Sequence, residues 1–204
     1  TLEEDFWANL EKGDTSALAI LAAEKGFYAE QGLEVEMVPF AAGKLAADAL
    51  MEGEVDYATA ADFVFAHAVA GGEDVVTLAS MARANVNYLV ARPDAGIEKV
   101  EDLAGARVGL TKGSQAEFYL ARMLQARGLS VADVEVVDMK PRELSDALVQ
   151  GDVDAVLFWE PHVTRVKERL GGDAVSWPAQ GGQDFYWLLL ARRGDYDERH
   201  ARAM

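Results

Sequence analysis

The chain has 204 residues, half of them hydrophobic and 26% charged, a composition typical of soluble globular proteins. Its formal net charge of −16 opposes binding to nucleic acid or to anionic lipid. It contains no cysteine, so disulfides, thiolate metal sites and cysteine nucleophiles are excluded. No run approaches the roughly 20 apolar residues that a membrane-spanning helix needs.

The first half of the chain alternates helical and strand patterns. Asp14, Thr15 and Ser16 offer N-cap side chains for a helix that continues to Phe27. Glycine follows two further predicted helices, at residues 44–52 and 63–70. Short runs rich in β-branched residues predict strands at residues 33–40, 55–59, 75–81 and 87–92.

The second half of the chain continues the same alternation. Apolar periodicity predicts helices at residues 115–127, 143–150 and 162–170. Between and after them, strands are expected at residues 106–110, 134–139, 154–158, 174–177 and 186–191. Strands that alternate with helices predict βαβ units, and therefore an α/β fold with mostly parallel sheets.

One sequence motif is repeated in the two halves of the chain. The segment DALMEGEVDYA begins at Asp48, and DALVQGDVDAV begins at Asp146, 98 residues later. Both segments contain a helix end, a glycine C-cap, a tight turn and a buried strand. We therefore expect two lobes of similar design, each with its own sheet. The alternative is that two unrelated βαβ units share common turn chemistry.

Four segments together resemble a known family. They are AAEKGFYAEQGLEVEMVPF from Ala22, ALMEGEVDYA from Ala49, RPDAGIEKVEDLAGARVGLTKGS from Arg92 and ALVQGDVDAVLFWEPHV from Ala147. This series resembles the solute-binding proteins of ABC importers, of the nitrate, sulfonate, taurine and thiamine-pyrimidine-precursor (NMT1/THI5-like) type.

The resemblance implies a type II periplasmic-binding-protein fold, with two Rossmann-like lobes and a ligand cleft between them. The expected lobes are residues 1–87 with 188–204, and residues 88–187. Compared with the family pattern, the chain looks shortened at both ends. The resemblance further implies a monomer that captures a small molecule by hinge closure, delivers it to an ABC permease in the membrane, and acts in the periplasm or outside the cell. Membrane association stays open.

Two other functions remain as alternatives. One is a ligand-sensing extracytoplasmic domain of a membrane signalling receptor. The other is an enzyme of menaquinone or thiamine synthesis on the same fold, although the cysteine-rich motif of the yeast-type pyrimidine synthase is missing. We expect no enzymatic activity and no cofactor. We also expect no metal site, because no two histidines have metal-ligand spacing. The pattern around His67 is that of a histidine packed within an apolar helix.

Ligands of open α/β sheets bind beyond the carboxyl ends of strands, which directs attention to the turns after the predicted strands. The first candidate follows the strand at residues 106–110 and opens a helix, where backbone amides favour an anion or a lone pair. It consists of Thr111, Lys112, Gly113, Ser114 and Gln115. The alternative is a simple N-cap made by Ser114 or Thr111.

The second candidate is the pair Trp159 and Glu160, where the aromatic ring forms a wall and the carboxylate accepts hydrogen bonds. Packing and a carboxylate at a helix start would explain this pair equally well. Asp62 occupies a comparable place in the first half, with helix capping as its alternative role. The remaining candidate ligand residues lie at turns or at the expected lobe crossings: Ser16, Gly43, Lys44, Thr59, Asn87 and Tyr186.

The ligand class stays open between two kinds of molecule. A sulfonate or nitrate-like anion would suit the helix start at Thr111–Gln115. A pyrimidine-like heterocycle would stack on Trp159 and Tyr186. The shortage of arginine near the candidate residues slightly favours an organic ligand with some aromatic character.

Overall fold

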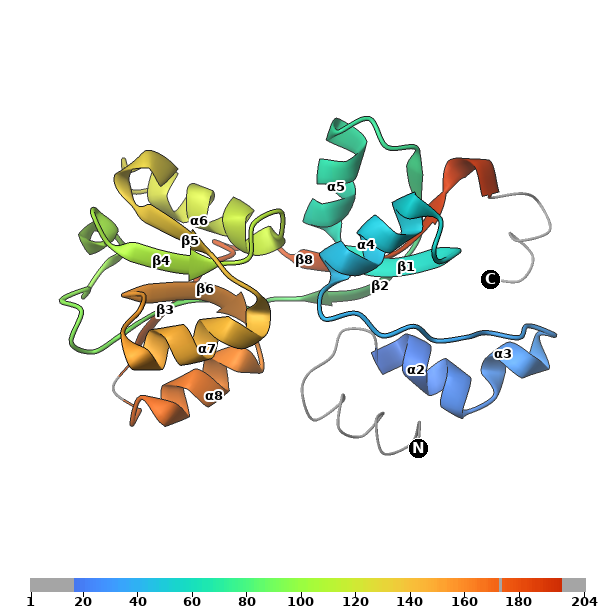
Figure 1. Cartoon of the computed structure of the whole chain (residues 1–204), viewed down its shortest axis with the longest axis horizontal. Coiled ribbons are helices and arrows are strands. Elements are labelled where there is room, and N and C mark those ends of the chain that lie inside the picture. Colours follow the sequence, from blue (N-terminus) through green and yellow to red (C-terminus); the bar gives the residue numbers. More distant parts are fainter. Residues whose placement is uncertain (1–16, 173, 196–204) are drawn as a thin grey trace. The chain divides into compact units, whose positions relative to one another are not determined.

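The computed structural model describes residues 17–172 and 174–195 (Figure 1). The chain forms two compact units: Thr1–Arg83 with Tyr186–Met204, called unit 1, and Ala84–Phe185, called unit 2. Each unit has its own sheet, as the repeat predicts. Compared with the expected lobes, residues 84–87 group with unit 2, because β3 begins at Asn87 and pairs there with β6. Tyr186 and Trp187 group with unit 1, because Trp187 pairs with Ala61.

Unit 1 contains a three-stranded sheet in the order β1-β8-β2. Its strands are β1 (Tyr57–Ala61), β2 (Val75–Ala84) and β8 (Phe185–Arg192). Its helices are α2 (Ala17–Glu24), α3 (Phe27–Glu30), α4 (Gly43–Glu52) and α5 (Asp62–Ala70), with a 3-10 turn at Arg193–Asp195. β1 runs antiparallel to β8, and both α4 and α5 contact β1.

Unit 2 contains a five-stranded sheet in the order β5-β4-β6-β3-β7. Its strands are β3 (Asn87–Ala91), β4 (Arg107–Leu110), β5 (Glu135–Asp138), β6 (Ala155–Trp159) and β7 (Val175–Pro178). Its helices are α6 (Gln115–Gln125), α7 (Pro141–Gln150) and α8 (His162–Arg169), with 3-10 turns at Val100–Leu103 and Val131–Asp133.

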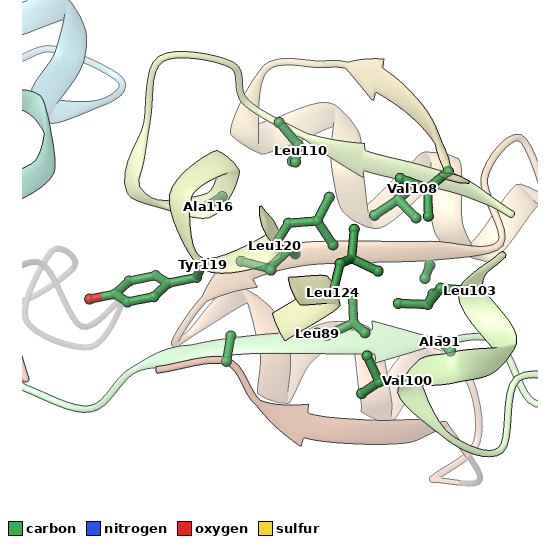
Figure 2. Packing of buried hydrophobic residues seen from close by; sticks show 14 of the residues in the cluster. Leu89, Ala91, Val100, Leu103, Val108, Leu110, Ala116, Tyr119, Leu120 and Leu124 are labelled. Carbon is green, nitrogen blue, oxygen red and sulfur yellow. The ribbon is translucent and has the colours of Figure 1, made fainter. Parts of the chain in front are cut away.

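Side-chain alternation along the strands of unit 2 produces two cores, one on each face of the sheet. On one face, Leu89 and Leu157 pack in the same cluster as Leu120 and Leu124 of α6 (Figure 2). On the other face, Val90, Val156 and Phe158 pack with residues of α7 and α8. All these side chains are fully buried, so the position of α6 on the sheet is set by apolar packing.

The sequence repeat is present as a structural repeat. α4 and α7 are both ten residues long, and each ends at a glycine with a positive φ, 81° at Gly53 and 86° at Gly151. Only glycine adopts this left-handed C-cap conformation without strain. The strands that follow, β1 and β6, also start 98 residues apart, at Tyr57 and Ala155.

An arginine secures the turn after the glycine in each unit. In unit 1, Arg192 donates to the backbone carbonyls of Leu50 and Val55. In unit 2, Arg107 donates to the carbonyls of Gly151 and Asp152, at 2.9 and 2.6 Å, and forms an ion pair of 2.8 Å with Asp154. Each arginine therefore bonds carbonyls in or beside the turn that links the helix to the following strand.

Three expectations from the sequence were wrong. The sheets are mixed rather than mostly parallel: β4 runs parallel to β5 and β6, whereas β3 is antiparallel to β6 and β7. Residues 33–40 form no strand, because their alternating pattern finds no ladder partner among the described residues. His67 is exposed on α5 rather than packed in the core, with its ring stacked on that of Phe63 at 6.1 Å.

Candidate functional site

The carboxyl ends of the parallel strands in unit 2 meet at one edge of the sheet, which we call the carboxyl edge. Thr111 follows β4, Met139 follows β5 and Glu160 follows β6. Because β3 is antiparallel to β6, its first residue, Asn87, lies opposite Trp159 at the same edge. The eight candidate residues of unit 2 therefore lie along this edge: Asn87, Thr111, Lys112, Gly113, Ser114, Gln115, Trp159 and Glu160.

Buried polar residues concentrate at this same edge. Four polar residues are buried in the described part of the chain, and all four lie along the carboxyl edge: Asn87, Ser114, Gln115 and Gln180. Burying a polar group has a cost unless it is paired, and the buried Asn87 Oδ1 has no hydrogen-bond partner among the described residues. The edge is therefore the strongest candidate for a binding site in unit 2.

The start of α6 is capped by the chain's own side chains. The Ser114 hydroxyl donates to the Thr111 carbonyl at 2.6 Å and accepts from the backbone N–H of Ala116 at 3.2 Å. The Glu117 carboxylate accepts from the N–H of Gly113 at 2.8 Å. Ser114 thus makes the N-cap that the sequence left as the alternative role of this segment.

A second carboxylate engages the loop before α6. Asp138 accepts from the backbone N–H of Lys112 at 2.9 Å, while the Thr111 hydroxyl donates to the Met139 carbonyl at 2.8 Å. Two negative side chains, Asp138 and Glu117, therefore already bind amides of this loop. These carboxylates lower the affinity of the loop for a bare inorganic anion.

Trp159 and Glu160 occupy the middle of the carboxyl edge. Glu160 accepts from the backbone N–H and the hydroxyl of Thr164, at 3.0 and 2.9 Å, so it caps the start of α8. Trp159 is half-buried and makes an edge-on contact with the ring of His162, whose centroid is 5.9 Å away. Burial lowers the pKa of His162, which therefore stays neutral to lower pH than an exposed histidine.

The remaining described candidates gather in unit 1, at the end of the sheet where β1 stops and β8 begins. Gly43 opens α4 so close to the sheet that an added Cβ would lie 2.7 Å from the Trp187 ring and 3.0 Å from the Ala60 Cα. Lys44 forms an i,i+4 ion pair of 2.5 Å with Asp48. The backbone carbonyl oxygen of Thr59 is the third close neighbour of that added Cβ, at 3.3 Å. The start of α4 has no side-chain cap and no acidic residue in its first turn.

Asp62 and Tyr186 meet at the same end of unit 1. The Asp62 carboxylate accepts from the backbone N–H of Phe63 at 2.9 Å and from that of Tyr186. Burial nevertheless raises the pKa of Asp62 above its usual value. Tyr186 itself is 38% exposed. Ser16, the last candidate, lies outside the described residues.

One residue of the edge was missed by sequence reasoning. Gln180 is buried and its side chain bonds four backbone groups, but it stands in a loop of glycines and polar residues that is typical of a solvated turn. Nothing in its local pattern separates it from the neighbouring Gln183.

A surface pocket of about 380 Å³ lies beside the edge, on the α8 face, and its lining includes Tyr88, Glu160 and Lys167.

Residues 15–200 match the family model described as NMT1/THI5 like. The chain belongs to this family. That match confirms the resemblance seen in the sequence, and it covers both units.

Relatives of this NMT1/THI5-like chain include solute-binding proteins. The taurine-binding periplasmic protein of Escherichia coli is 28% identical over 190 residues, which are 89% of this chain and 56% of that protein. Another relative, a binding protein of Brucella abortus, is 24% identical over 168 residues, 82% of this chain and 49% of its own length. The chain thus spans about half the length of the curated relatives it matches.

Solved structures confirm the fold class. The periplasmic aliphatic sulphonate binding protein of Escherichia coli has a TM-score of 0.73 at 26% identity, over 93% of this chain and 64% of that one. The alkanesulfonate-binding protein of Xanthomonas axonopodis, bound to MOPS, has a TM-score of 0.74 at 26% identity, over 94% and 65%. This NMT1/THI5-like chain therefore has the α/β periplasmic-binding-protein fold. Among the described residues, no helix has the length and apolar character needed to cross a membrane.

Proposed function

We propose that this NMT1/THI5-like chain is the solute-capturing part of a periplasmic binding component that serves an ABC importer. The observation that carries the proposal is the gathering of every buried polar residue of the described chain at one sheet edge. Family membership supports it, because relatives with the same fold are named as periplasmic binding proteins. The membrane permease would be the physiological partner, and the periplasm the place of action.

The proposed ligand is a small organic sulfonate. The half-buried ring of Trp159 offers apolar surface for an organic tail, whereas the carboxylates on the α6 loop disfavour a bare anion there. Sulfonate and taurine binding by the relatives supports this class over a pyrimidine-like heterocycle.

We further propose that the ligand is bound without chemical change. The acidic side chains at the carboxyl edge of unit 2 already serve the fold: Glu160 caps α8, and Glu117 and Asp138 bind loop amides. A general acid or base needs a carboxyl group that can reach the reacting proton. After incubation of the chain with taurine, the NMR spectrum of taurine should therefore be unchanged.

Titration calorimetry tests the binding function. The probes are taurine, ethanesulfonate, nitrate and an aminopyrimidine. A true ligand at a concentration of 100 times its dissociation constant also adds about 2.7 kcal/mol to the free energy of unfolding. We expect heat and stabilisation with the sulfonates and not with nitrate or the aminopyrimidine. Trp159→Ala should weaken sulfonate binding, while the control Phe27→Ala, at a side chain 51% exposed on α3, should not. Binding of the aminopyrimidine alone would contradict the proposed ligand class.

A further inference from the structure

The chain passes between the two units twice, after Arg83 and after Phe185. Strand β2 ends at the first crossing and strand β8 begins at the second. These two strands are hydrogen-bonded neighbours in the unit 1 sheet. We call residues 84–87 and 180–185, where the chain enters and leaves unit 2, the connecting segments.

One buried side chain bonds both connecting segments. The Gln180 Nε2 atom donates to the backbone carbonyl of Ala84 at 3.1 Å and to that of Gln183 at 2.8 Å. Both N–H groups of this amide are therefore used. Ala84 lies beside the first crossing and Gln183 close to the second, so a single amide group joins the chain that enters unit 2 to the chain that leaves it.

The same side chain spans the break between β2 and β3, where Asn85 and Val86 belong to no strand. Gln180 Oε1 accepts from the backbone N–H groups of Val86 and Asn87, at 2.7 and 3.0 Å. On the other side of the break, Nε2 bonds Ala84. Exchanging the oxygen and the nitrogen would set donors against donors, so the orientation of this amide is fixed. A change in the backbone angles of Asn85 would therefore stretch hydrogen bonds to Gln180.

Gln180 is held in place by the unit 2 sheet. The residue is 1% exposed and follows β7 closely. The N–H of Ala179 donates to the Asn87 carbonyl at 2.9 Å, which continues the pairing of β7 with β3. The N–H of Glu160, at the end of β6, donates to the Val86 carbonyl at 3.0 Å. The connecting segments are thus fastened to the sheet on their unit 2 side.

We propose that Gln180 is a positioning residue that clamps the two connecting segments together and so limits how far the units turn relative to each other in the ligand-free chain. Bending that separates Ala84 from Val86 or from Gln183 has to break buried hydrogen bonds, which are costly to leave unmade. The inference adds to the proposed function and does not depend on its ligand class. A smaller range of unit positions leaves less freedom to be lost when a solute is bound.

Distances between two spin labels test the clamp. The chain contains no cysteine, so labels attach only where cysteine is introduced. Glu54→Cys in unit 1 and Gln125→Cys in unit 2 both replace exposed residues. Pulsed electron–electron double resonance then gives the distribution of label-to-label distances in the ligand-free chain. Gln180→Leu should broaden it, with the population outside the main wild-type peak rising about tenfold, the effect of losing one or two net hydrogen bonds.

Two matched variants separate the clamp from a general effect of altering this loop. Gln180→Glu keeps an acceptor for the N–H groups of Val86 and Asn87 but lacks the amide donors, so its distribution should lie between those of the wild type and Gln180→Leu. Gln183→Leu removes a side chain that bonds Arg122 of α6 rather than the other connecting segment, and it should leave the distribution unchanged. Circular dichroism checks folding, and Gln180→Glu carries the same test if Gln180→Leu does not fold.

The outcomes distinguish this inference from the proposed function. Equal widths for the wild type and the folded Gln180 variants would overturn the inference. So would equal broadening by Gln180→Leu and Gln183→Leu, because the effect would then belong to the loop as a whole. Neither result bears on solute binding, which the calorimetric titration with sulfonates tests by itself.

Discussion

Gly43 is the position where the structure makes the sharpest prediction about stability. A Cβ added at Gly43 would lie 2.7 Å from the Trp187 Cη2 atom and 3.0 Å from the backbone Cα of Ala60. Carbon atoms are best separated by about 3.5–4.0 Å, so both neighbours would have to move, and Ala60 belongs to strand β1. Gly43→Ala should therefore destabilise unit 1 by about 1–3 kcal/mol, as overpacked cores do.

Chemical denaturation of paired variants measures this effect. The control is Gly194→Ala, because an added Cβ there meets nothing within 4 Å and the backbone does not need glycine. That substitution should be neutral or slightly stabilising, since alanine restricts the unfolded chain. In the double variant Gly43→Ala/Trp187→Phe, the smaller side chain lacks the part of the indole that carries Cη2, so part of the lost stability should be restored. Equal midpoints for Gly43→Ala and Gly194→Ala would refute the close-packing argument.

Three further predictions concern unit 2. Arg107 holds the pKa of Asp154 below its usual value, so Asp154→Asn should lower the free energy of unfolding near pH 7. In acid denaturation this loss of stability should shrink as the pH falls below about 4, because the ion pair stabilises the chain above the pKa of unfolded Asp154 and stops doing so as the pH falls through the pKa of folded Asp154. A loss of stability that does not change with pH would contradict this. Ser114→Ala should lower the free energy of unfolding, measured by urea denaturation, by about 1 kcal/mol, because α6 loses its N-cap. Unchanged stability together with weaker sulfonate binding would instead indicate that Ser114 binds the ligand. Leu124→Ala should cost about 2–5 kcal/mol and the exposed Leu18→Ala less than about 0.5, and similar values for the two would contradict the assigned core.

The candidate site was partly predictable because strand ends carry local signals. Thr111, Ser114 and Glu160 each stand between a strand and a helix in the sequence, and the structure places all three at the carboxyl edge. What their side chains do there depends on distant residues. Thr111 donates to Met139, 28 residues away, so no local pattern could have shown that its hydroxyl is engaged.

The sequence by itself determined the repeating design of the chain. Glycine at a helix end and the apolar run after it are local requirements, so the 98-residue repeat predicts where α4, β1, α7 and β6 lie. Strand direction and pairing were decided only by the tertiary structure, because a strand needs a partner that the local sequence does not name. Residues 33–40 have the pattern but find no partner in the described part of the chain, and β3 pairs antiparallel within an otherwise parallel group. The contact of Gln180 with Asn87 likewise spans 93 residues, and it exists only because β7 returns beside β3.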